Sequence, residues 1–159
     1  TKLIMSKQPK HSELFPDLED VFRASFSLAD LERNVNLSVI NTLNLPITNG
    51  LPTKASKVPP REKYHSGGEN GYDVVIEVNG DIFEMLNPAH QAIVAEETVA
   101  QISYSFENDK ITISKPDYQV MSMIANKHGH DIMEGVRKTV KVCYSHQKDL
   151  ADETKAITA

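Results

Sequence analysis

The sequence predicts an α+β fold, in which helices pack on a small twisted sheet that is mixed or antiparallel. Residues 72–78 form a β-branched run, residues 102–106 and 110–114 alternate like the two strands of a hairpin, and Pro88 opens a helix. The chain has 159 residues, of which 40% are hydrophobic and 25% charged, and this suits a soluble protein with a buried core. We therefore expect a single domain.

We place this domain at residues 17–146, between a flexible arm at residues 1–16 and a polar tail at residues 147–159. The arm is polar and shows no hydrophobic periodicity. Residues 17–23 and 28–33 each predict a short helix.

The second of these helices would begin after Ser27, which can act as its N-cap, with Asp30 as the acidic residue of the first turn. Residues 36–43 predict a strand. Residues 49–70 contain several prolines and glycines, so they predict either a long surface loop or an extended edge segment around residues 55–58.

The next part of the chain has clearer signals. The strand at residues 72–78 is followed by Asn79-Gly80, a turn pair, and residues 82–86 predict a helical turn. Asn87 and Pro88 supply an N-cap and a proline at the first helical position. The helix that they open is expected to run to about Gln101 and to pack on the sheet.

The C-terminal part predicts the hairpin and two further helices. Residues 107–109 would form the polar turn of the hairpin. Pro116 is expected to open one helix and Gly129 to end it. The last helix is expected to start near Asp131, with an apolar stripe made of Ile132, Val136, Val140 and Cys143.

Composition limits the possible functions. Residues 1–70 carry nine Lys/Arg against eight Asp/Glu, whereas residues 71–159 carry eight against fourteen, which together give the net charge of −5. This acidic C-terminal half argues against tight non-specific binding to nucleic acid. No apolar run approaches the ~20 residues that span a bilayer. We therefore expect no membrane partner. The single cysteine excludes an internal disulfide, so we expect a reducing cytoplasm.

The helix after Pro88 contains the run Glu96-Glu97-Thr98-Val99-Ala100. A zinc-peptidase helix carries His-Glu-x-x-His, because histidines four residues apart share a face and hold one zinc while the glutamate acts on the bound water. Here the glutamate is present as Glu97, but Glu96 and Ala100 stand at the histidine positions. The run therefore indicates a helix like that of a zinc peptidase, but it does not indicate peptidase activity.

The order of the segments resembles a known family. Lys-Ala-Ser-Lys-Val-Pro-Pro at residues 54–60 precedes the strand at residues 72–79, the turn at 82–86 and the helix at 86–101. The hairpin, Pro116-Asp117 and Ala-Asn-Lys-His-Gly at residues 125–129 then follow in order. Over roughly residues 30–130, this arrangement resembles the zincin-like metallopeptidase domain encoded by bacteriophages.

The chain departs from that family at its metal motif. Thr53 stands where the family has glycine, and residues 117–119 lack the histidine expected as a further ligand. Glu97 alone carries over, at the position of the general base. The resemblance thus implies a phage-encoded zincin-like fold that has lost its peptidase chemistry, in the host cytoplasm.

Several residues remain as candidate site residues. Glu96 and Glu97 form either a solvated helix turn or a vestigial cleft used for binding. His128 and His130 lie at a helix end, where histidine often has a structural role. A zinc site that joins His65, Glu97 and His128 is possible only if the 49–70 segment folds back.

The last predicted helix contains further candidate residues. Cys143 lies on the apolar stripe, which favours a buried inert thiol over a nucleophile paired with His146. Lys138 and Lys141 could meet a phosphate backbone or an acidic partner, or could be ordinary surface lysines.

From these features we predict a non-enzymatic phage accessory protein that binds a host or phage macromolecule, most simply a protein, without a cofactor. Binding would use the 49–70 segment and the edge around Glu96 and Glu97. Two alternatives stay open: a divergent metal-dependent hydrolase with relocated ligands, and a nucleic-acid-binding regulator.

Overall fold

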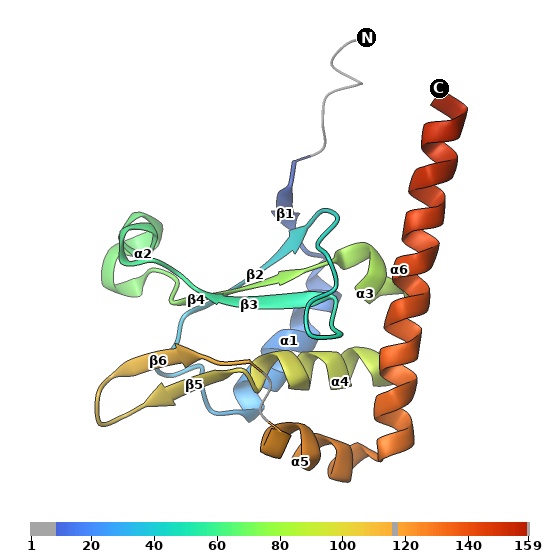
Figure 1. Ribbon diagram of the computed structural model, residues 1–159. Coiled ribbons are helices and arrows are strands. Elements are labelled where there is room, and N and C mark those ends of the chain that lie inside the picture. Colours follow the sequence, from blue (N-terminus) through green and yellow to red (C-terminus); the bar gives the residue numbers. More distant parts are fainter. Residues whose placement is uncertain (1–8, 116–117, 159) are drawn as a thin grey trace.

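The computed structural model describes residues 9–115 and 118–158, and it confirms the α+β prediction (Figure 1). The strands are β1 (His11–Glu13), β2 (Leu37–Thr42), β3 (Thr53–Lys57), β4 (Val74–Val78), β5 (Ile102–Ser105) and β6 (Lys110–Ile113). The helices are α1 (Pro16–Leu28), α2 (Pro60–Gly67), α3 (Gly80–Met85), α4 (Pro88–Val99), α5 (Tyr118–His128) and α6 (His130–Thr158), with the short 3-10 helix η1 at Gly68–Asn70.

The main sheet is mixed, and its strand order is β1-β2-β4-β3. β2 and β4 are parallel, whereas β1 and β3 pair antiparallel with their neighbours. Because side chains alternate along a strand, one face of β4 carries the fully buried Val74, Ile76 and Val78, and the other face carries the partly exposed Val75 and Glu77. Helices α1, α3 and α4 cover the buried face of this sheet, and β5 and β6 form a separate hairpin.

The core lies between the buried face of the sheet and helices α1, α3 and α4 (Figure 1). The rings of Phe22 on α1 and Phe83 on α3 lie 4.9 Å apart, and both side chains are fully buried. On α4, Thr98 Oγ1 donates to the carbonyl of Val94, so Thr53 of β3 must donate in its 2.7 Å hydrogen bond with Thr98 Oγ1. This bond joins α4 to the sheet edge.

The N-terminal part differs from the prediction. The first predicted helix lies within α1, where Leu18, Phe22 and Phe26 form one buried stripe at four-residue spacing. The second, predicted at residues 28–33, is wrong, because α1 ends at Leu28 and residues 29–33 are not helical. Ser27 lies in the last turn of α1 and caps nothing. The arm is shorter than expected: β1 pairs with the edge of β2 and the next residue, Leu14, is buried, whereas residues 1–8 lie outside the described part.

For residues 49–70 the structure selects the extended alternative. β3 is an edge strand paired with β4, and α2 follows it with Pro60 at the start of the helix. The chain reaches β3 through a turn at Asn49 and Gly50, whose φ angles of 54° and 78° are left-handed. The long-loop alternative is therefore wrong for most of this segment.

The C-terminal helices match the prediction in part. Gly129 has a φ of 96° and separates α5 from α6, as expected. Ile132 was wrongly placed on the buried stripe of α6: it is 48% exposed, and Met133 is buried instead. The helix start predicted at Pro116 lies outside the described residues.

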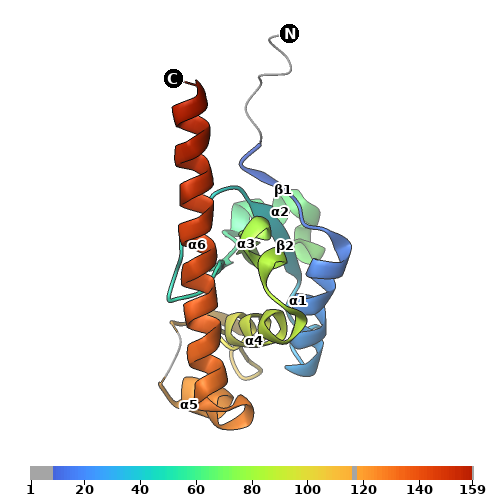
Figure 2. The same cartoon turned by 90° about the vertical axis from the view of Figure 1, so that its right-hand side faces the viewer.

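The polar tail predicted at residues 147–159 is helical through Thr158 and forms the end of α6, which is 29 residues long. Its sequence after Gly135 contains no glycine or proline to stop the helix. Figures 1 and 2 both show the C-terminal end of α6 extending beyond the sheet and the other helices.

Asn79 was predicted to lie in a turn, but it is the N-cap of α3. Its Oδ1 accepts from the amide of Ile82 at 3.3 Å, and its Nδ2 donates to the carbonyl of Leu45 and to Gln147 Oε1. One nearly buried amide thus joins the end of β4, the β2–β3 loop and α6. A Cβ at Gly80 beside it would lie 2.6 Å from Asn41 Oδ1, so a larger residue there would have to displace the Asn41 side chain, which accepts a hydrogen bond from the Gly80 amide.

We expect Asn79→Ala to lower the free energy of unfolding by about 2 kcal/mol, since it removes the cap of α3 and the hydrogen bonds of Asn79 to Leu45 and Gln147, although the Tyr144 hydroxyl still donates to the Leu45 carbonyl. The matched control is Asn87→Ala, because Asn87 caps α4 at an exposed position. Its loss should be about 1 kcal/mol. Urea denaturation of both variants measures the difference, and equal losses would contradict the linking role of Asn79.

Candidate functional site

The two adjacent glutamates near the end of α4 lie in different environments. Successive residues on a helix point about 100° apart, so Glu97 faces the interior while Glu96 faces a surface groove. Glu97 is 2% exposed, whereas Glu96 is partly exposed. The expectation of a solvated helix turn is therefore wrong for Glu97.

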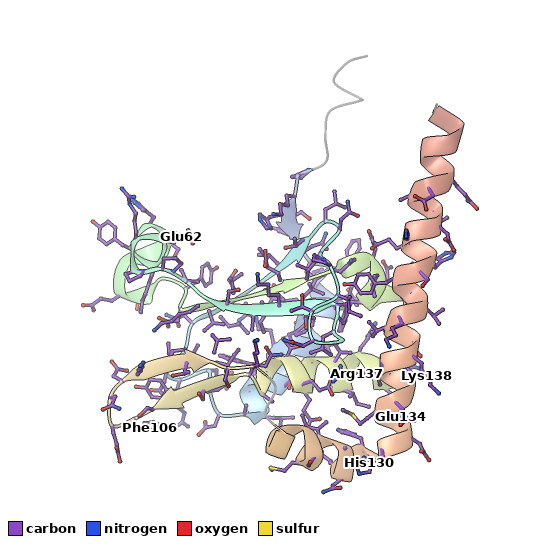
Figure 3. The ribbon with its side chains drawn as sticks, viewed as in Figure 1. Glu62, Phe106, His130, Glu134, Arg137 and Lys138 are labelled. Carbon is purple, nitrogen blue, oxygen red and sulfur yellow. The ribbon has the colours of Figure 1, made fainter. Side chains whose placement is uncertain are left out.

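Glu97 is held by Arg137 of α6. Arg137 Nη2 donates to Glu97 Oε1 at 3.1 Å, and Arg137 Nη1 lies 3.1 Å from Glu97 Oε2. Figure 3 shows Arg137 on the side of α6 that faces the rest of the domain. Burial raises the pKa of Glu97, and the charge and hydrogen bond of Arg137 oppose that rise. The pair connects α4 to α6.

The same guanidinium also fixes the loop before β3. Arg137 Nη1 donates to the carbonyl of Gly50 at 3.3 Å. A Cβ at Gly50 would lie 3.1 Å from Arg137 Cδ, and the φ of 78° there already disfavours other residues. Glycine therefore allows the loop to lie against the arginine.

Glu96 pairs with the C-terminal end of α5. Lys127 Nζ donates to Glu96 Oε1 at 3.2 Å, and His128 Nε2 donates to Glu96 Oε2 at 2.7 Å. Burial would raise the pKa of Glu96, but the hydrogen bonds and charges of His128 and Lys127 hold it below its usual value. His128 thus has a structural role, with a carboxylate partner that the sequence did not indicate.

An apolar groove with a volume of about 520 Å³ lies beside Glu96. Its walls come from α1, α4 and the residues that cap them, and Lys127 and His128 lie at the α5 side. Most of the groove is lined by small or branched hydrocarbon side chains, among them Val21, Ala24, Leu28, Ala92, Val99 and Ala100. Leu28 is 88% exposed at its rim.

The histidines predicted as zinc ligands are not brought together with Glu97. His65 is exposed on α2, where its ring packs edge-on against Tyr64, and α2 lies at the opposite end of the domain from α5 (Figure 1). His130 is exposed at the start of α6. Among residues 9–115 and 118–158 no three His, Cys, Asp or Glu side chains are grouped so that they could hold a metal ion.

The remaining candidates lie on α6. Lys138 and Lys141 are exposed, but the acidic Asp131 and Glu134 share the exposed surface of this helix, and Figure 3 labels Glu134 and Lys138 one turn apart. The lysines are therefore not part of a uniformly basic strip. Cys143 is buried, as predicted, and burial raises the pKa of its thiol, which disfavours the reactive thiolate.

Sequence reasoning missed Arg137 and Lys127 as partners of the two glutamates. Arg137 lies next to Val136 on the buried stripe, and a charged residue at the border of such a stripe is a signal that a buried partner exists. Lys127 had no comparable signal, because it is an exposed lysine.

Within the described part of the chain, no helix is long and apolar enough to cross a membrane. A comparison of the chain with known protein families, curated proteins and solved structures finds no match.

We expect Arg137→Met to lower the free energy of unfolding by about 3–5 kcal/mol at neutral pH, because it leaves the Glu97 carboxylate buried without a cation. The loss should shrink as the pH falls, since the pKa of Glu97 is already raised by burial and protonation removes the uncompensated charge. Denaturant unfolding at several pH values measures this. Lys138→Met is the control and should change stability by less than about 0.5 kcal/mol; a loss in Arg137→Met that does not depend on pH would contradict the account.

We expect Glu96→Gln to lower stability by roughly 0.2–1 kcal/mol, the range for a partly exposed ion pair. The folded-state pKa of Glu96 lies below the usual value of 4.5, so its ionised form stabilises the fold above that pH. The difference between wild type and Glu96→Gln should therefore disappear as the pH falls below 4.5 and through the folded-state pKa. A difference that grew on acidification would exclude this role.

Proposed function

We propose that this chain is a non-enzymatic phage accessory protein, which binds another protein through a degenerate zincin-like domain. The single observation that carries the proposal is the environment of Glu97. This glutamate is the residue that the resemblance places at the general base, and it is buried and paired with Arg137.

The residues around Glu97 do not fit a catalytic zinc ion. A general base must reach a metal-bound water, whereas both oxygens of Glu97 lie 3.1 Å from guanidinium nitrogens. At the two ligand positions, Ala100 has no donor atom and Glu96 is engaged by Lys127 and His128. Lys127, His128 and Arg137 thus engage the two carboxylates that stand where a zincin has a zinc ligand and its general base.

The surface next to this cluster supports binding to a protein. The apolar groove beside Glu96 offers hydrocarbon surface, which protein partners cover and a polyphosphate backbone does not. Binding through Glu97, as the sequence suggested, is not possible, because its side chain is buried. The phage setting depends on the resemblance alone.

The test of the non-enzymatic part is hydrolysis of a fluorogenic casein substrate with and without added zinc. We expect wild type and Glu97→Gln to remain at the level of the buffer control, because the Glu97 carboxylate is buried against the Arg137 guanidinium. Zinc-dependent cleavage that is lost in Glu97→Gln would overturn the proposal in favour of a metal-dependent hydrolase.

A further inference from the structure

We propose that a cavity on the outer face of the main sheet binds an organic cation, in which an ammonium or guanidinium group is carried by a short hydrocarbon chain. The cavity is separate from the groove beside Glu96, and this inference does not depend on the proposed function. Three features carry it: an apolar sheet side, hydrogen-bond acceptors at the rim, and carboxylates in a described lining that contains no lysine or arginine.

The cavity lies on the face of the sheet that is turned away from the core. Because side chains alternate along a strand, Ile40 of β2 and both Val75 and Glu77 of β4 lie on this outer face. Figure 1 shows α2 at the end of β3, on the side of the sheet away from α1 and α4. Residues of the sheet, of α2 and of β1 line a cavity of about 340 Å³, a volume suited to a small ligand.

The sheet side of this cavity is apolar. Ile40, Val58 and Val75 contribute branched hydrocarbon side chains, and all three remain partly exposed. A hydrocarbon chain that covers them is favoured because it removes apolar surface from water. Tyr72 also lines the cavity, and the face of an aromatic ring attracts cations.

A hydrogen-bond network at one end of the cavity leaves acceptors free. Thr42 Oγ1 donates its only proton to Glu77 Oε1 at 3.2 Å, so His11 Nδ1 must donate in its 3.1 Å hydrogen bond with Thr42 Oγ1. A neutral His11 therefore carries its proton at Nδ1 and has an acceptor at Nε2. The hydrogen bond from Thr42 uses only Oε1 of Glu77, which leaves Oε2 as a second acceptor.

The charges around the cavity favour a cation over an anion. Glu62 and Glu77 both line it, and Figure 3 labels Glu62 on α2. Among residues 9–115 and 118–158, no cationic side chain is paired with Glu62. Lys54 lies opposite Glu77 in the sheet, but the two side chains form no ion pair. The lining thus offers acceptors and negative charge, which a cation with N–H donors complements.

The test compares three probes of similar length, n-pentylamine, n-pentanol and pentanoate, by NMR titration of the isotope-labelled wild-type chain. We expect pentylamine to shift the amide signals of Ile40 and Val75. It should bind at least about tenfold more tightly than pentanol, because only the amine forms charged hydrogen bonds. Pentanoate should not bind.

A second comparison identifies the source of the cation. A tripeptide with a central lysine is titrated beside its norleucine counterpart, which has the same hydrocarbon chain without the ammonium group. Binding of the lysine tripeptide alone would assign the cavity to a side chain of a protein partner. Binding of pentylamine but of neither tripeptide would assign it to a free amine.

Two variants locate the site. Glu77→Gln should weaken pentylamine binding by about tenfold, the loss expected for a hydrogen bond to a charged group. Glu62→Lys should weaken it by about threefold or more and should allow pentanoate to bind, because a cation then lies at the rim. Glu69→Lys on η1 is the matched control: it makes the same charge change outside this cavity and should leave the Kd within about twofold. Thermal unfolding of each variant confirms that the fold is retained.

Three outcomes would overturn the inference. Equal binding of pentylamine and pentanol would exclude recognition of the cation. Shifts confined to other parts of the chain, or a Kd that neither Glu62→Lys nor Glu77→Gln changes, would exclude this location. A lack of saturable binding by pentylamine would exclude the site altogether, and it would leave the proposed function unaffected.

Discussion

The buried ion pair between Glu97 and Arg137 is the constraint on which the arrangement of the domain depends. A carboxylate with 0% side-chain exposure is tolerated only beside a compensating charge, so α6 must keep Arg137 turned toward α4. The apolar stripe of α6, which includes Val136 and Val140, packs on the core. Apolar packing alone restricts the rotation of α6 about its axis only loosely. The Arg137 guanidinium restricts it more, because it must lie between the Glu97 carboxylate and the carbonyl of Gly50. The pair thus sets the position of the helix along α4.

The neighbouring residue, Glu96, connects α4 to another helix, α5. Glu96 receives Lys127 and His128, so it holds the end of α5 against α4 and thereby shapes one side of the apolar groove. Two consecutive residues of one helix therefore organise two different parts of the structure. Both carboxylates are engaged by side chains of other helices, and this supports our proposal of a binding function.

Local chemistry predicted much of the fold. Asn87 and Pro88 open α4 as expected, Gly129 ends α5, and the alternating residues around 107–109 form a hairpin. The sequence predictions were wrong where contacts between residues far apart in the chain determine the structure. Ser27 has the chemistry of a helix cap, yet Phe22 and Phe26 need a continuous helix to reach the core. The burial of Glu97 could not be predicted from its neighbours, because its partner is 40 residues away and only the folded chain brings them together.

The strand order also governs how the protein must assemble during synthesis. β4 lies between β2 and β3 and pairs with both, while β2 and β3 do not neighbour each other. A ribosome makes β2 and β3 first, so the nascent chain carries both with their inner edges open until Val78 has emerged. β4 must then insert between β2 and β3 and pair with both. Unpaired strand edges can pair with another chain. The open edges of β2 and β3 therefore favour wrong pairing until β4 has been synthesised.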